Sequence, residues 1–254
     1  MSFPPTRWCS SATDLIRRDV IKTGLAALAA VGSRGALWRL PRSPAGTSVL
    51  FQGDSITDCG RDRAVADPNR AGALGTGYPQ LISSAELAAH PPNGLKFYNR
   101  GVSGNTVPDL EQRWATDTLA LKPDVLSILI GVNDYWHKRN GNYTGTVADY
   151  ETGYAALLKA TRQALPAVRL VVIEPFVLRC GAVDATWFPE FDERRAAAAR
   201  VARQANATFV PLHDTFTELA SRTSPEYWAA DGVHPTPAGH GLIAERWRRA
   251  VRLS

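Results

Sequence analysis

The feature that most constrains the fold of this chain is an alternation of short apolar runs and helical patterns that begins near residue 47. Each apolar run has five to seven residues, the length of a buried strand, and the first four end at glycine or proline. The runs are Thr47–Gln52, Leu95–Asn99, Asp124–Ile130, Arg169–Ile173 and Ala207–Leu212. The fifth run is the weakest, because Pro211 cannot donate a backbone hydrogen bond to a neighbouring strand.

Between these runs lie segments whose apolar residues recur with a helical period. They are Tyr78–Ala89, Val107–Leu119, Thr146–Leu165, Phe191–Ala205 and Pro237–Val251. Strands that alternate with helices predict a parallel sheet covered on both faces, so we expect an α/β fold: a three-layer α/β/α sandwich around a central parallel sheet of about five strands. Because crossovers are right-handed, the carboxyl ends of the strands share one edge, where open sheets of this kind bind ligands.

The charge of the chain is unevenly distributed. The net charge of +5 lies within residues 1–46, which hold seven basic and two acidic residues, whereas residues 47–254 hold 22 of each. A neutral body gives no basic surface for phosphates, so we expect no nucleic-acid partner.

Residues 1–46 have the pattern of an export leader. The paired Arg17–Arg18 precede the short apolar run Gly24–Val31, and Ser43–Ala45 forms a small-x-small cleavage site before Gly46. The pair resembles a twin-arginine signal, although Val20 stands where Phe is commoner. The apolar run is too short to span a bilayer, so we expect export without stable membrane insertion once the leader is removed. The alternatives are a disordered basic arm or a misassigned start codon.

The chain has three cysteines and no CxxC motif. Cys9 lies in the leader, which leaves Cys59 and Cys180 as a possible pair in an exported protein; two separate thiols are the favoured interpretation. A metal site needs three or more convergent ligands, and no such spacing occurs, so no metal is expected.

Polar blocks follow the predicted strands and recur near the last helix. They read GDS at 53–55, SG at 103–104, GVND at 131–134 and DGVH at 231–234. A nucleophilic hydroxyl needs a base, and the base needs an orienting carboxylate. Ser55, His234 and Asp231 supply these groups in one of the chain orders that such triads adopt.

Each block also has an interpretation without catalysis. Ser55 could cap a helix, Asn133 and Asp134 could form a turn, Asp231-Gly232 is a turn sequence, and His234 could be a surface histidine. The four blocks together, each at the predicted ligand edge, favour catalysis.

The four blocks, in this order, resemble those of the SGNH, or GDSL, hydrolase family, and the resemblance covers residues 47 to about 251. It implies a flavodoxin-like fold and a metal-free serine esterase that uses no cofactor. Ser55 is then the nucleophile, His234 the base and Asp231 the carboxylate that orients it. The resemblance also implies an oxyanion hole formed by the backbone N–H groups of Ser55 and Gly104 and the amide of Asn133. Gly101 remains an alternative to Gly104 as a donor.

The sequence indicates the type of reaction more clearly than it indicates the substrate. Asp54, Tyr135, Trp136 and Trp187 are candidate substrate contacts near the strand ends, since aromatic faces stack on sugars or line acyl pockets. We expect an esterase for acyl, most simply acetyl, groups on carbohydrate. A lysophospholipase or thioesterase is the alternative within the class, and a non-catalytic carbohydrate-binding module is the alternative outside it. Either a monomer or a homodimer is compatible with the sequence.

Overall fold

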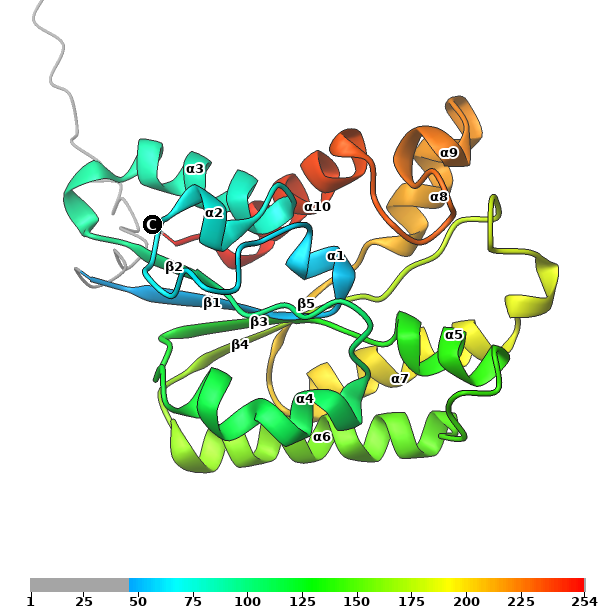
Figure 1. Ribbon diagram of the computed structural model, residues 1–254, viewed down its shortest axis with the longest axis horizontal. Helices are drawn as coiled ribbons and strands as arrows, with labels where there is room; N and C mark the ends of the chain where they lie inside the picture. Colours follow the sequence, from blue (N-terminus) through cyan, green and yellow to red (C-terminus); the bar gives the residue numbers. More distant parts are fainter. Residues whose placement is uncertain (1–45, 254) are drawn as a thin grey trace, which may run out of the picture. The chain divides into compact units, whose positions relative to one another are not determined.

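The structure, a computed structural model, describes residues 46–253 and contains one five-stranded parallel sheet (Figure 1). Its strands are β1 Ser48–Gly53, β2 Lys96–Asn99, β3 Val125–Leu129, β4 Arg169–Ile173 and β5 Thr208–Val210. They lie in the order β2-β1-β3-β4-β5, and each pairs in parallel with its neighbours. The predicted parallel sheet is therefore confirmed.

The order of the strands places a switch point beside β1. The chain leaves β1 toward β2 on one side and returns to β3 on the other, so the crossovers diverge at the carboxyl end of β1. Open α/β sheets bind ligands in the crevice outside the strands at such a point. Ser55, two residues after β1, lies there.

The strands have two buried faces because their side chains alternate between two apolar clusters. Val49, Phe51 and Ile173 belong to one cluster, whereas Leu50 and Leu126 belong to the other. Helices α3 Tyr78–Ala89, α8 His213–Arg222 and α10 Pro237–Val251 cover the first face. Helices α4 Val107–Trp114, α6 Val147–Ala164 and α7 Glu190–Gln204 cover the second, which gives the predicted three layers (Figure 1).

Shorter elements complete the described chain. They are α1 Ser55–Asp58, α2 Ala71–Leu74, α5 Val132–Arg139, α9 Pro225–Trp228, the 3₁₀ turns η1 Pro91–Asn93 and η3 Ala185–Trp187, and a π-helical turn, η2 Ala115–Leu119. Asn133 and Asp134, which could have formed a turn, lie in the first turn of helix α5, a helix that was not predicted. Helix α8, in which Phe216 is the sole buried residue, was not predicted either.

Within residues 46–253, no helix is both long enough and apolar enough to cross a membrane. The predicted export leader, including Arg17–Arg18 and the Ser43–Ala45 cleavage site, lies outside the described residues.

Candidate active site

Three predicted side chains meet at the switch point, although Ser55 and His234 are 179 positions apart in the sequence. Ser55 Oγ lies 2.8 Å from His234 Nε2, and His234 Nδ1 lies 2.6 Å from Asp231 Oδ2. Both contacts are at hydrogen-bond distance and run in a line from hydroxyl to imidazole to carboxylate. The arrangement can move a proton from Ser55 to His234 while Asp231 holds the imidazole tautomer.

Asp231 orients His234 within a four-residue turn. Its Oδ1 accepts hydrogen bonds from the backbone N–H groups of Val233 (2.9 Å) and His234 (2.7 Å), which leaves Oδ2 for the imidazole. Partial burial opposes ionisation of this carboxyl, but the bonds from His234 and Val233 outweigh it and hold the pKa of Asp231 below its ordinary value. The carboxylate is therefore charged at neutral pH.

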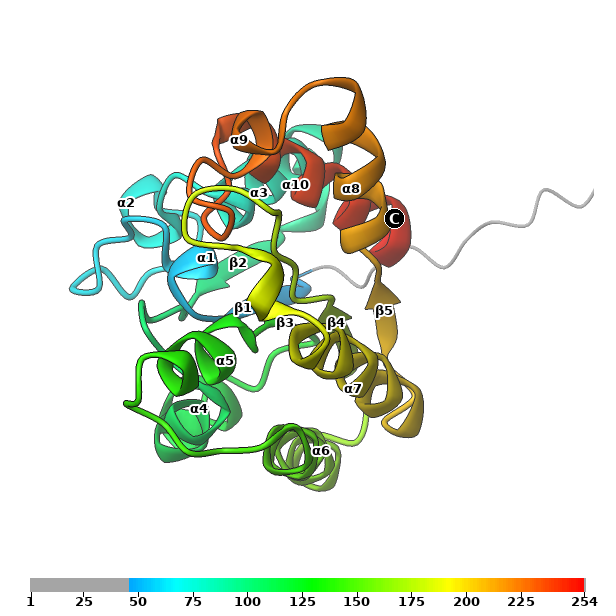
Figure 2. The same ribbon diagram turned by 90° about the vertical axis from the view of Figure 1, so that its right-hand side faces the viewer.

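The loop between β4 and α7 supports this turn from behind. Leu178 N donates to Gly232 O at 2.8 Å, and Ala182 N donates to Asp231 O at 2.9 Å. An isolated antiparallel bridge joins Ala229 to Pro235 across the base of the turn. Figure 2 shows α1, α5 and this loop around the same edge of the sheet.

Ser55 is the first residue of α1, and Asp54 caps that helix, so the prediction that Ser55 itself is the cap was wrong. Asp54 Oδ1 accepts from Ile56 N at 3.0 Å. Gly53, with φ +155°, allows the sharp turn from β1 into α1. A Cβ there would lie 2.3 Å from the carbonyl oxygen of Leu129 and 2.4 Å from Thr57 Oγ1, so no other residue fits without displacing the backbone.

Two of the predicted backbone donors of the oxyanion hole are left without a partner among the described residues. The N–H groups of Ser55 and Gly104 have no backbone or side-chain acceptor among residues 46–253, whereas Gly101 N donates to Asn99 Oδ1 at 2.8 Å. Gly104 has φ +84°, and a Cβ built on it meets no atom within 4 Å. Of the two glycines, Gly104 is therefore the one with a free donor and open space in front of it.

Asn133 lies in the first turn of α5, directly after β3, and is 6% exposed. Its Nδ2 donates to the carbonyl oxygen of Asn105 at 3.2 Å. An amide nitrogen carries two hydrogens, so one remains for a ligand. The bond to Asn105 also fixes the amide beside the segment that holds Gly104.

Asp58, which was not among the predicted site residues, ties α1 to the segment with Gly104. Its Oδ2 accepts from both Ser103 N (3.0 Å) and Ser103 Oγ (2.8 Å), and it pairs with Arg63. Burial opposes the charge of Asp58, but the bonds from Arg63 and Ser103 outweigh it and lower the pKa of this carboxyl. No motif marks this residue, because its partners come from separate loops.

Two further carboxyls lie buried beneath the site. Burial raises the pKa of Asp54 to about 7 and that of Asp134 to about 6, and the charge of Asp134 contributes to the first shift. One oxygen of each accepts a backbone N–H, from Ile56 and Val107 respectively, and the other oxygen has no partner among the described residues. These residues support the site from below.

The candidate substrate contacts divide into one half-buried residue and three buried ones. Trp136 is half-buried and its ring lies 6.0 Å from that of His234. Asp54 is 1% exposed, Tyr135 5% and Trp187 0%, so a substrate does not reach their side chains. The expectation for these three is corrected: Tyr135 and Trp187 pack edge to face in the core, 5.3 Å apart, and Asp54 caps α1.

The two described cysteines are separate thiols. Cys59 ends α1 in a left-handed conformation, and its Sγ lies 3.3 Å from His240 Nε2. Because Tyr78 N donates to His240 Nδ1, the proton of that neutral ring is on Nε2 and points at Cys59. Cys180 Sγ contacts the carbonyl oxygen of Ala229. Within residues 46–253, no three His, Cys, Asp or Glu side chains gather as a metal site.

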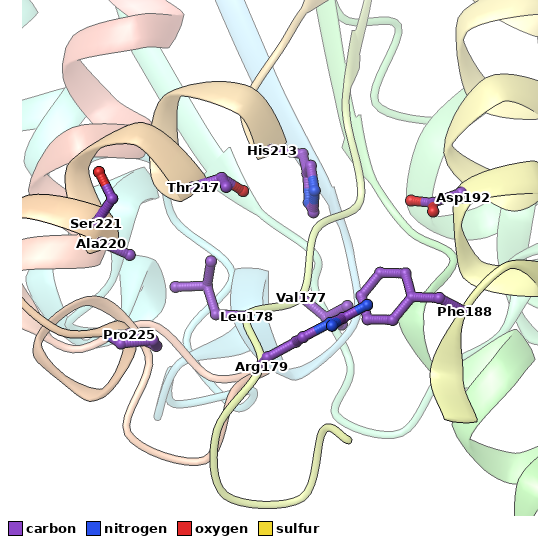
Figure 3. A pocket seen from close by; sticks show the side chains of 10 residues that line it. All are labelled: Val177, Leu178, Arg179, Phe188, Asp192, His213, Thr217, Ala220, Ser221 and Pro225. Atoms are coloured by element: carbon purple, nitrogen blue, oxygen red, sulfur yellow. The ribbon is translucent and has the colours of Figure 1, made fainter. Parts of the chain in front are cut away.

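A hollow of about 380 Å³ lies on the other side of the β4–α7 loop and includes none of the triad residues (Figure 3). His213 points into it from the start of α8, and Arg179 lies over the ring of Phe188, 4.9 Å from its centroid. The loop segment Val177–Arg179 forms one wall of this hollow, and Leu178 within it also holds Gly232.

Residues 51–242 match the sequence profile of the GDSL-like lipase/acylhydrolase family. An acetylxylan esterase from Geobacillus stearothermophilus is 35% identical over 208 residues, which cover 81% of this chain and 94% of that protein.

Solved structures agree with this match. One from Parabacteroides merdae, described as a GDSL-like lipase, is 44% identical with a TM-score of 0.81 and covers 84% of this chain and 99% of its own. The Geobacillus esterase is 32% identical in its crystal structure, with a TM-score of 0.75 and coverage of 84% and 97%. Catalytic mutants of that esterase replace a serine or a histidine with alanine.

Proposed function

The chain belongs to the GDSL-like lipase/acylhydrolase family and is a carboxylic ester hydrolase, and from this premise we propose that it removes acetyl groups from a carbohydrate by serine catalysis. The observation that carries the proposal is the chain of hydrogen bonds from Ser55 Oγ through His234 to Asp231, together with the N–H groups of Ser55 and Gly104, free among residues 46–253, and the second amide hydrogen of Asn133. A degenerate, non-catalytic module would not retain all of these groups.

In the first half of the reaction, Ser55 Oγ attacks the acyl carbon as its proton passes to His234 Nε2. The negative charge that forms on the carbonyl oxygen is held by the N–H groups of Ser55 and Gly104 and by the amide of Asn133. The tetrahedral intermediate then collapses. The sugar hydroxyl leaves with the proton from His234, and the acetyl group stays on Ser55 as an ester.

In the second half, a water molecule attacks the acyl group of Ser55 and gives a proton to His234. The new tetrahedral intermediate expels Ser55 Oγ, which recovers its proton from the imidazole, and acetate is released. Asp231 stays ionised throughout, because its lowered pKa keeps it a carboxylate facing the imidazolium.

The acetyl and carbohydrate parts of the proposal are supported by the relatives. The acetylxylan esterase aligns with 81% of this chain, and a solved relative is described as an acetyl-xylooligosaccharide esterase. In this chain, the half-buried ring of Trp136 lies 6.0 Å from that of His234, and the part of it that is open to solvent is an aromatic surface on which a sugar ring can pack.

The test is a substrate panel on the purified protein, with Ser55→Ala as the control. We expect rapid release of acetate from acetylated xylo-oligosaccharides, slower release from p-nitrophenyl butyrate, and little from long-chain acyl esters. Equal rates for wild type and Ser55→Ala on p-nitrophenyl acetate would exclude serine catalysis. A clear preference for acyl chains above eight carbons would instead assign the protein to the lysophospholipase or thioesterase class.

For residues 1–46 we propose a twin-arginine export leader, supported by Arg17–Arg18 and the small residues at Ser43–Ala45. A reporter fused to this segment should appear outside the cytoplasm, and Arg17→Lys with Arg18→Lys should retain it inside. Export of the double variant at the wild-type rate would contradict this proposal.

A further inference from the structure

A cluster of arginines lies next to the segment that carries Gly104. Arg61, Arg63 and Arg100 line one open hollow of about 440 Å³, together with Val102 and Asp117. Its volume is within the range of small-ligand sites, about 300–1,000 Å³. Val102 precedes Gly104 by two residues, a span of about 7 Å at most. The hollow is therefore close enough to the oxyanion donors for one substrate chain to reach both.

The positive charge of this cluster exceeds the negative charge that pairs with it. Arg61 and Arg63 share Asp58, and Arg113, packed behind them, pairs with Asp117. The side chain of Arg100 makes no hydrogen bond or ion pair with any residue in the range 46–253. Asp58 and Asp117 are therefore already paired, and the side chain of Arg100, which lines the hollow, is left to bind an anion.

The guanidinium groups are near enough to repel one another. Burial lowers the pKa of Arg61; Asp58 opposes this effect, and the charges of Arg100, Arg63 and Arg113 add to it. Such crowding is unfavourable in the free protein, and an incoming anion relieves it. A carboxylate suits a guanidinium especially well, because two parallel N–H···O bonds can form.

We propose, on the basis of the proposed function, that this arginine hollow is a subsite. It binds the carboxylate of an acidic sugar that belongs to the same acetylated carbohydrate. Ser55 then acts on acetyl groups near a uronic acid branch, and Arg100 is the residue that selects them. Asp58 keeps the adjoining arginines and Ser103 in place, so that the subsite and the oxyanion donors have a fixed spacing.

The test compares two acetylated xylo-oligosaccharides of equal length, one with a uronic acid branch and one without. We expect wild-type kcat/KM to be about three- to tenfold higher on the branched substrate at low salt. The preference should fall toward one at 0.5 M NaCl, because salt screens partly exposed charges. Arg100→Gln should lose the preference and Arg100→Glu should reverse it, while both keep wild-type turnover of the neutral p-nitrophenyl acetate.

Arg222→Gln is the matched control, because it also removes one positive charge. Arg222 belongs to α8, which lies beside β5, the edge strand on the other side of the sheet from β2 (Figure 2). This variant should keep the preference for the branched substrate. Equal kcat/KM on both oligosaccharides, or a preference that survives in Arg100→Glu, overturns this inference and leaves the esterase proposal intact. Failure of the esterase proposal would give a different result: turnover of p-nitrophenyl acetate that does not depend on Ser55.

Discussion

The two halves of the active site are built in opposite ways. The half that carries Ser55, Gly104 and Asn133 is embedded in the sheet edge and tied down by buried contacts from Asp58 and Asn105. The half that carries Asp231 and His234 is one exposed turn, with 41% and 46% of the two side chains open to solvent. The oxyanion half thus depends on the whole fold, whereas the acid–base half takes its geometry from four consecutive residues and the loop behind them.

This difference predicts which substitutions affect activity alone and which also affect stability. The partly exposed side chains of Asp231 and His234 contribute little to the free energy of unfolding, unlike Val233 between them, which is buried in the core. A side chain in the embedded half holds two segments together, so its loss lowers both activity and stability.

The largest expected effect is that of His234→Ala. Removing the base should lower kcat about 10⁴- to 10⁶-fold, measured with p-nitrophenyl acetate. The free energy of unfolding, measured with urea, should change by less than about 0.5 kcal/mol. A double Ser55→Ala/His234→Ala variant should lose no further activity, because the residues act as a unit. A marked loss of stability in His234→Ala would show that the turn is not self-contained.

The next largest effect is expected for Asn133→Ala, which should lower both activity and stability. Loss of one oxyanion donor should lower kcat about 10²- to 10³-fold. Loss of the bond to Asn105 should lower the free energy of unfolding by about 1 kcal/mol. The control is Asn140→Ala at the exposed end of the same helix, which should leave both quantities near wild type. If Asn133→Ala were as stable as wild type, the two halves of the site would not differ in their contribution to stability.

The pH dependence of stability in Asp54→Asn tests whether Asp54, in the embedded half of the site, is protonated in the folded chain. The folded chain keeps the proton of Asp54 up to a pKa of about 7, whereas the unfolded chain loses it near the ordinary value of 3.8. Between those pH values the unfolded state binds fewer protons, so the free energy of unfolding falls as pH rises and levels off above about pH 7. Between pH 5 and 8, wild type should lose about 2–3 kcal/mol more than Asp54→Asn. Urea unfolding at both pH values measures this difference.

Exposed Asp67→Asn is the control for that measurement, and its stability should follow wild type at both pH values. Parallel pH profiles for wild type and Asp54→Asn would contradict the buried, protonated state of Asp54.

Asp58→Asn should have the smallest effect on activity of these variants, and it should lower the free energy of unfolding by only about 1–2 kcal/mol, because Arg63 is half-exposed and its attraction to Asp58 is screened by water. It should also lower kcat severalfold, since Ser103 is then held less firmly beside Gly104. Asp62→Asn in the adjacent loop should change the free energy of unfolding by under about 0.5 kcal/mol. A full wild-type kcat in Asp58→Asn would mean that Ser103 is positioned without it.

The sequence predicted the elements whose physical signal is local. Arg169–Ile173 and Pro237–Val251 have the predicted boundaries, since an apolar run and a helix-starting proline mark them. Helix α5 was missed because it follows β3 without a capping side chain and has a polar sequence. Helix α8 was missed because it buries one residue, too few for a visible period.

The same limit applies to the site. The polar blocks could be read from the chain because each is a few residues long, and the structure brings Ser55, His234 and Asp231 into contact. Burial of Trp187, or the contact between Asp58 and Ser103, depends on segments far apart in sequence, and no single run of residues encodes it.

Because Ser55 and His234 are far apart in the sequence, the ribosome adds them to the chain at different times. At about 5–20 residues per second, a ribosome needs roughly 10 to 40 seconds to add the 179 positions between them. The nascent chain therefore carries its nucleophile long before its base. Helix α10, whose Trp247 anchors to Ser127 on β3, follows His234 directly and is made later still. Synthesis itself thus delays hydrolysis until nearly all of the sheet and its covering helices have been translated.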